Sequence, residues 1–244
     1  MTRDRLHPVL ASIDLVVLDK DGTLIEFDAM WAGWMEALAD CLEAALDRPV
    51  RDRLYGVLGF DSARGRAASH GPLATMPMAV LRRSTFDALT AVGVAPESAT
   101  HALERCWAPP DPVALAHPLA DLPALFGTLR AAGLRLAVAT SDDRAPTERT
   151  LTALGLDGLV EDVVCADDGS AVKPSPAIVE GICGRLGVPP GRTAMVGDAP
   201  ADLEMGRAAG VGACIGVLSG TGSRSELEPL ADVLLASVGD LIVG

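Results

Sequence analysis

Two carboxylates two residues apart are the first sign of chemistry in this chain. Asp19 and Asp21 stand in the string Asp19-Lys-Asp-Gly-Thr23, directly after the apolar run Ile13–Leu18. Two nearby carboxylates do not both ionise easily, so their pKa values separate and one can act as a nucleophile while the other carries a proton. An aspartate carboxylate can accept a phosphoryl group as an aspartyl-phosphate. The alternative is an ordinary surface turn, because Asp and Gly are common turn residues.

Two further aspartates occur in the string Gly197-Asp198-Ala-Pro-Ala-Asp202. One or two carboxylates, together with substrate oxygens and water, are the usual way in which proteins hold Mg²⁺. Asp202 has a simpler explanation as well, because an acidic residue in the first turn of a helix interacts favourably with the helix dipole. If Asp19 and Asp198 follow two strands of one sheet, both can reach the same metal ion.

Lysine is scarce in this sequence, which has 20 basic residues but only two lysines, Lys20 and Lys173. A compact ammonium group differs from a guanidinium in what it binds, so each lysine is a candidate for a specific task. Lys173 is predicted to lie beside the carboxylates and to offset the negative charge of nucleophile and phosphate. Thr140 and Ser141, after another apolar run, are predicted to contact phosphate oxygens.

The elements that position these residues follow from the hydrophobic pattern. Short apolar runs, at residues 13–18, 134–139, 160–165, 193–196, 213–217 and 233–235, alternate with helical stretches of about ten residues. This alternation predicts an α/β fold with a Rossmann-like parallel sheet. Such sheets bind ligands beyond the carboxyl ends of their strands, where all the polar strings above are found.

The hydrophobic pattern of the sequence changes between the first predicted strand and the later ones. Residues 26–110 contain alanine-rich amphipathic stretches and no convincing strand, and the segment Gly59–Pro72 interrupts them as a loop. We therefore predict a catalytic core of residues 1–25 and 111–244, with residues 26–110 inserted as a helical cap.

Composition excludes several classes of protein. The chain has 244 residues, of which 49% are hydrophobic, and carries a formal charge of −13. This acidity argues against a nucleic-acid partner. No apolar run is long enough for a membrane span and the start lacks the apolar stretch of a secretory signal, so we predict a cytoplasmic protein without membrane contact. The five cysteines form no metal-like spacing and are predicted to be reduced.

Four strings of this sequence match, in order, the four motifs of the haloacid dehalogenase-like hydrolases. They are Asp19-Lys-Asp-Gly-Thr23, Thr140, Lys173-Pro174, and Gly197-Asp198 with Asp202. Within that superfamily the chain resembles the phosphoglycolate phosphatase-like group, whose helical cap is inserted after the first motif. The resemblance covers essentially the whole chain, although for the cap it extends only to the type of cap.

The resemblance implies a role for each matched residue. Asp19 is expected to form an aspartyl-phosphate, and Asp21 to protonate the leaving alcohol and later to accept a proton from water. Mg²⁺ is expected to bind the Asp19 carboxylate, the Asp21 backbone carbonyl and Asp198, with Asp202 as a ligand or its neighbour. Phosphate oxygens are expected to contact Lys173, Thr140, Ser141 and the amides near Gly22.

Asp21 distinguishes the chain from dehalogenases of the same superfamily, which lack an acid at that position. Lys20 stands where many relatives have an apolar residue, and we assign it no catalytic role.

The cap loop has Arg64 and Arg66, which are suited to bind a carboxylate or a second phosphate of the substrate, or are ordinary surface arginines. Trp31 is interpreted as core or as cap-to-core packing rather than as a substrate contact. The spacing of the glycines in the segment 216–222 does not match that of a nucleotide-binding loop, so we predict a flexible loop there.

The predicted function is therefore Mg²⁺-dependent hydrolysis of a small phosphate monoester, phosphoglycolate-like or a sugar phosphate. A phosphomutase of the same fold and a non-catalytic binding module are the alternatives. The sequence does not identify the substrate, and it leaves both a monomer and a homodimer open.

Overall fold

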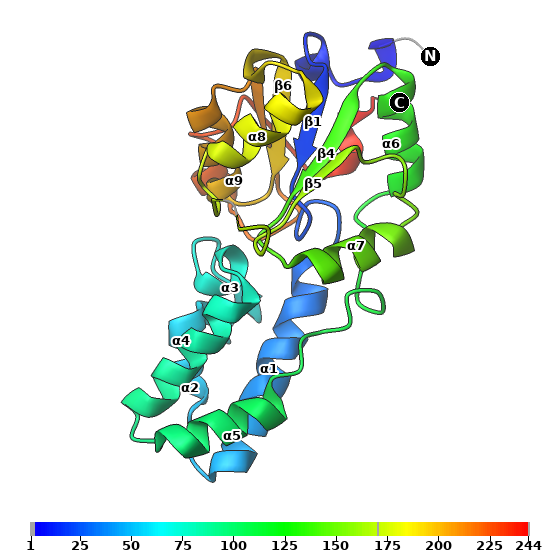
Figure 1. Ribbon diagram of the computed structural model, residues 1–244. Helices are drawn as coiled ribbons and strands as arrows, with labels where there is room; N and C mark the ends of the chain where they lie inside the picture. The colour runs from blue at the N-terminus through cyan, green and yellow to red at the C-terminus, as the bar shows by residue number, and fades with distance from the viewer. Residues whose placement is uncertain (1–2, 170, 244) are drawn as a thin grey trace.

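The computed structural model describes residues 3–169 and 171–243 of the chain. Figure 1 shows two parts, one built around a sheet and the other built of helices. Both chain termini lie in the sheet part, because the helical part is an insertion between the first strand and the rest of the sheet.

Six parallel strands form the sheet within the described residues, in the order β5-β4-β1-β6-β7-β8. The predicted parallel α/β fold is thus confirmed, and each predicted strand is present with ends that shift by two residues at most. Val17 of the central strand lies opposite Ala137 on one side and Met195 on the other. The strands are β1 (Leu15–Leu18), β4 (Arg135–Ala139), β5 (Asp162–Val164), β6 (Thr193–Gly197), β7 (Ala213–Val217) and β8 (Val233–Leu235).

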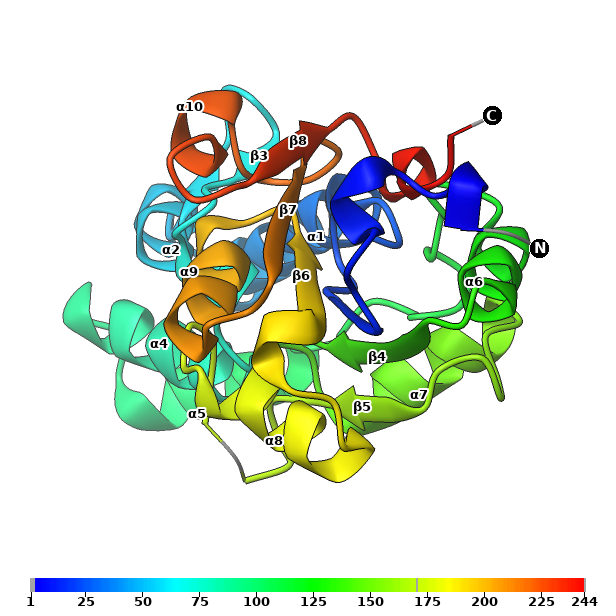
Figure 2. The same ribbon diagram turned by 90° about the horizontal axis from the view of Figure 1, so that it is seen from above.

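Side chains of β1 alternate between two apolar layers, as the pleat of a strand requires. Val16 and Leu18 pack with α6 (Leu122–Ala131) and α7 (Arg144–Ala153). Leu15 and Val17 pack with α8 (Ala177–Leu186) and α9 (Pro200–Ala209) on the other face. All four side chains are fully buried, which explains why the strand reads as a continuous apolar run rather than an alternating one. Figure 2 shows α8 and α9 on one side of the sheet and α6 on the opposite side.

Short elements complete the sheet part. They are α10 (Arg224–Leu227) and the 3₁₀ turns η1 (Arg3–Arg5), η2 (Pro8–Leu10), η3 (Pro190–Arg192) and η4 (Val238–Leu241).

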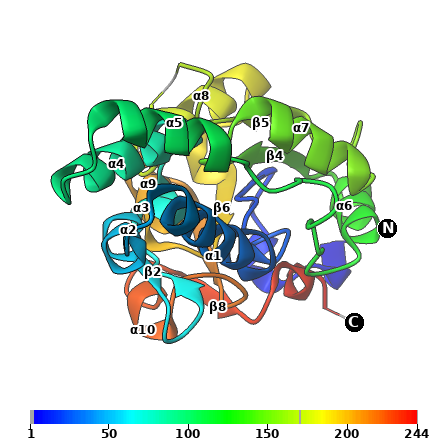
Figure 3. The same ribbon diagram turned by 90° about the horizontal axis from the view of Figure 1, so that it is seen from below.

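The helical part has an apolar core of its own, largely separate from the sheet. Its longest helix, α1, buries eight residues that recur three or four positions apart, so one stripe of the helix faces its neighbours. In Figure 3 this helix lies between α2 and α5. None of the described helices is long and apolar enough to cross a membrane. The helices are α1 (Phe27–Leu46), α2 (Arg51–Leu58), α3 (Pro72–Thr75), α4 (Met78–Ala91) and α5 (Pro96–Cys106).

The chain passes between the two parts near residues 26 and 110, as the predicted domains require, but the domain limits themselves remain a prediction. The prediction that the cap contains no strand is wrong. Two-residue strands, β2 (Phe60–Asp61) and β3 (Arg66–Ala67), pair in antiparallel fashion within the segment interpreted as a loop. Strands of two residues are too short to produce an alternating pattern that sequence analysis can detect.

The prediction of reduced cysteines is wrong for one pair. Cys41 of α1 and Cys106 of α5 form a disulfide, although they are 65 residues apart. Packing of the two helices brings their Cα atoms to 5.6 Å, within the range that a disulfide needs. The other three cysteines are free and buried, namely Cys165, Cys183 and Cys214.

Candidate active site

The predicted functional residues meet at one edge of the sheet. Asp19, Thr140 and Asp198 follow the adjacent strands β1, β4 and β6, and Lys173 reaches the same edge from the loop after β5. After β1 the chain first forms β4 and β5 on one side of β1, and later forms β6, β7 and β8 on the other side. Such a reversal of strand order opens a crevice at the carboxyl ends of the strands. These four residues line one pocket, together with Asp21, Ser141 and Asp202.

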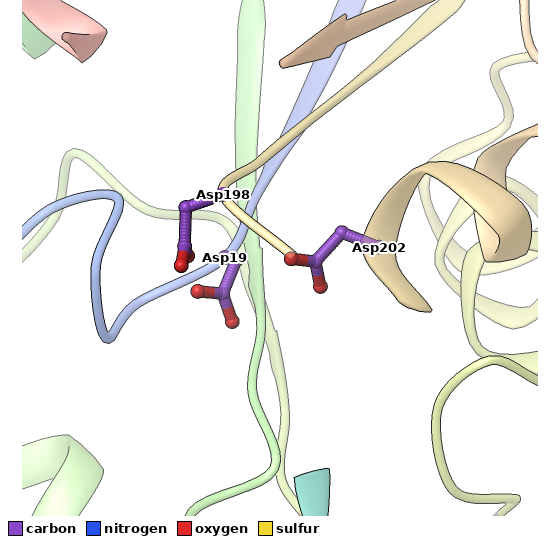
Figure 4. A group of neighbouring side chains, drawn as sticks. All are labelled: Asp19, Asp198 and Asp202. Carbon is purple, nitrogen blue, oxygen red and sulfur yellow. The ribbon is translucent and has the colours of Figure 1, made fainter. Parts of the chain in front are cut away.

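Three carboxylates in this pocket form a site suited to a cation. Asp19, Asp198 and Asp202 are all buried, and each offers an oxygen within 4.8 Å of the others. Figure 4 shows their carboxyl groups directed toward a common space. Buried carboxylates need positive charge to remain ionised together, and oxygen ligands are what Mg²⁺ prefers. This donor set therefore fits the predicted metal ion. The Asp21 side chain lies outside the set, and binding through its backbone carbonyl stays a prediction.

Asp198 is held in place by three donors. Thr23 donates its hydroxyl to one carboxylate oxygen at 3.1 Å, and Thr221 donates its backbone N–H at 2.8 Å and its hydroxyl at 3.2 Å to the other. Thr221 belongs to the glycine-containing segment 216–222, predicted as a flexible loop, and connects this segment to the site. Sequence analysis missed both threonines, because neither is adjacent to Asp198 in the chain.

Lys173 is the charged partner of two of these carboxylates. Its Nζ lies 2.5 Å from an oxygen of Asp19 and 2.7 Å from an oxygen of Asp202. Burial by itself lowers the pKa of a lysine, but the two carboxylates outweigh it and raise the pKa of Lys173. The ammonium therefore stays charged and offsets part of the negative charge at Asp19.

Burial and mutual repulsion change the acidity of the carboxyl groups. Burial raises the pKa of Asp198 to about 6, and the neighbouring Asp202 contributes in the same direction. Burial also raises the pKa of Asp19 well above its ordinary value, although Lys173 opposes the shift. Without a cation, both groups are therefore harder to ionise in the folded protein than in the unfolded chain.

These shifts predict how the stability of the metal-free protein depends on pH. The pKa of Asp198 is higher in the folded protein than in the unfolded chain. The contribution of this group to the free energy of unfolding is therefore fully present below the pKa of the unfolded chain, and it is lost as the pH rises through about 6. The loss from this group is up to roughly 3 kcal/mol. We expect denaturant unfolding in EDTA to show it between pH 4 and 7, and Asp198→Asn to flatten the dependence. The exposed Asp52→Asn is the control, and an equal flattening there contradicts the assignment.

A second ion-pair group lies beside the pocket. Lys20 is fully buried, and its Nζ lies 2.8 Å from one oxygen of Asp21 and 3.1 Å from Asp142. The two carboxylates raise the pKa of Lys20 against the opposing effect of burial, so the lysine stays charged. Lys20 does not line the pocket, but it holds the side chain of Asp21. Asp142 was not among the predicted site residues.

Gly22 allows the close approach of two motifs. Its φ is +89°, and a Cβ atom at this position would lie 2.5 Å from the Asp198 carboxyl group. Its N–H donates to the carbonyl of Ile25 at 2.7 Å. The expectation that this amide binds phosphate is therefore not supported, because the amide is already bonded within the turn.

The two cap arginines do not line the pocket within the described residues. Arg64 is largely exposed and pairs with Asp61 at 3.7 Å. Arg66 pairs with Asp28 at 3.0 Å and donates to the carbonyl of Gly220 at 2.5 Å, which ties the cap loop to the loop beside Asp198. Binding of substrate by either arginine stays a prediction. Trp31 is buried in the core of the helical part, as the sequence favoured, and it also lines the pocket.

The family follows from comparison with known proteins. Residues 13–210 match the model of the haloacid dehalogenase-like hydrolases, and the chain belongs to this family. A phosphoglycolate phosphatase of Rhodospirillum rubrum is 37% identical over 54% of this chain and 55% of its own length. A probable phosphatase, IndB, of Dickeya dadantii is 29% identical over 94% of this chain and 92% of its own length.

The fold has relatives among solved structures. The crystal structure of a HAD phosphatase from Thermococcus onnurineus covers 94% of this chain and 96% of its own, with a TM-score of 0.66 and 22% sequence identity. This likeness concerns the fold. Several curated relatives, among them that of R. rubrum, are matched over only about half of their length.

Proposed function

We propose that this protein is a Mg²⁺-dependent phosphatase that hydrolyses a small phosphate monoester through an aspartyl-phosphate on Asp19. The observation that carries the proposal is the placement of Asp19. It lies at the end of the central strand, paired with Lys173 and grouped with two further buried carboxylates at the base of a pocket. Family membership and the similarity to proteins named as phosphatases support the same activity.

The residues divide the work as follows. The Asp19 carboxylate attacks phosphorus and the bond to the leaving oxygen breaks, while Asp21 gives that oxygen a proton. Asp21 then takes a proton from water, the water oxygen attacks phosphorus, and the bond to Asp19 breaks to release phosphate. Lys20 holds the Asp21 carboxyl group near the pocket during both steps.

Charge is controlled by groups around the nucleophile. Lys173 contacts Asp19 and remains charged, so it reduces repulsion between this carboxylate and the incoming phosphate. The Thr140 hydroxyl and Ser141 line the pocket and are the proposed donors to phosphate oxygens. Asp19, Asp198 and Asp202 would hold Mg²⁺, which supplies positive charge for phosphoryl transfer when bound.

Metal removal tests the proposal. We expect the purified protein to release phosphate from an aryl phosphate in the presence of Mg²⁺, and EDTA to lower the rate at least about 100-fold because several kcal/mol of charge stabilisation is lost. Renewed Mg²⁺ is expected to restore the rate. The measurement is colorimetric phosphate release, extended to alkyl and sugar phosphates. Release that is indifferent to EDTA contradicts the metal requirement.

A further inference from the structure

The pocket has two unlike walls. Its base comes from the sheet part and consists of the polar groups described above together with Ala199 and Ala201. The opposite wall comes from the helical part and is apolar, with side chains from the start of α1, from α3 and from the start of α4. These are Phe27, Trp31, Leu73, Ala74, Met76, Met78 and Leu81, with Thr75 as the polar exception.

Charge in the pocket is strongly one-sided. Its described lining includes five aspartates and a single cation, Lys173, which is already paired with Asp19 and Asp202. Arg66 of the cap loop is paired with Asp28 and does not line the pocket. A leaving group with its own carboxylate would therefore be desolvated without a counter-charge, beside carboxylates of the protein.

Trp31 connects this apolar wall to a second hollow. The same tryptophan and Met78 also line a neighbouring pocket. Its apolar residues include Met30, Pro109, Pro110 and Pro112, and its charged residues are Asp111, Asp142, Asp143 and Arg149, of which Arg149 pairs with Asp111 at 3.4 Å. Its indole N–H has no hydrogen-bond partner among the described residues. Trp34, one turn along α1, donates its N–H to the carbonyl of Ala108 at 2.9 Å. A buried N–H without a partner is rare.

We propose that the phosphate ester this site accepts is that of an uncharged, largely apolar alcohol, and that esters of hydroxy acids such as phosphoglycolate are poor substrates. This inference rests on the proposed phosphatase function and adds the chemical class of the leaving group. The phosphate lies against Asp19 and Lys173, and the alcohol lies against the apolar wall of the cap.

Matched ester pairs test the inference. Ethyl phosphate and phosphoglycolate differ by a methyl group in place of a carboxylate, as do 4-methylphenyl and 4-carboxyphenyl phosphate. We expect kcat/KM with Mg²⁺ to be at least about tenfold higher for the uncharged member of each pair. A preference for the carboxylated members overturns the inference while leaving the phosphatase proposal intact. Absence of phosphate release from all four esters overturns both.

A charge placed on the apolar wall gives a second test. Met76 lines the pocket and is 40% exposed, so Met76→Lys is compatible with folding. With the new ammonium, kcat/KM for the carboxylated ester is expected to rise at least about tenfold relative to kcat/KM for the uncharged ester. Met76→Gln controls for loss of the methionine, and Val80→Lys places the same charge on exposed α4 surface outside the pocket lining. An unchanged ratio in Met76→Lys overturns the inference.

Discussion

Asp19→Asn is expected to lower phosphate release at least about 10⁴-fold, because loss of a nucleophile removes the covalent route as a whole. Asparagine has nearly the same shape as aspartate, but its amide does not attack phosphorus. The remaining residues keep their positions, so substrate binding persists while turnover is lost. The measurement is the steady-state rate with Mg²⁺, combined with rapid acid quench to detect phosphorylated protein.

The control for this change is the same substitution at an exposed position. Asp52 lies on the surface of α2, and Asp52→Asn is expected to retain the wild-type rate. Thermal unfolding of both variants verifies that they fold. If Asp19→Asn releases phosphate at the wild-type rate, or still forms phosphorylated protein, Asp19 is not the nucleophile.

Lys20→Met is expected to destabilise the protein by about 3–5 kcal/mol, the usual cost of removing one partner from a buried ion pair. The ammonium of Lys20 is fully buried between Asp21 and Asp142, and without it two neighbouring carboxylates lose their counter-charge. For a chain of this size the loss corresponds to a fall in Tm of about 10 °C. Denaturant unfolding gives the free energy directly.

A double-mutant cycle distinguishes the ion pair from simple packing. Asp142→Asn removes one of the two charges that Lys20 neutralises, so Lys20→Met should cost less in that background than in the wild type. We expect a coupling of about 1–3 kcal/mol between the two positions. Additive losses would contradict the assigned interaction, since residues that do not interact contribute independently.

Local patterns were enough to predict most of the architecture. Each strand of the sheet is a short apolar run that ends in polar or glycine-containing sequence, and each adjoining helix has its own amphipathic pattern. In a parallel sheet the carboxyl ends of all strands lie on one edge, so Asp19, Thr140 and Asp198 were placed together from their positions after strands alone. The scarcity of lysine singled out Lys173, and Asp202 stood in the same short string as Asp198.

The sequence by itself determined the fold class and the acidic centre of the site, because both depend on periodicity and on short strings of residues. Only the tertiary structure decided which distant side chains meet. Cys41 pairs with Cys106, Thr221 binds Asp198, and Trp31 becomes a wall of the pocket instead of serving only as core. Such contacts depend on how helices and loops pack against one another, and no spacing within a single element specifies that packing.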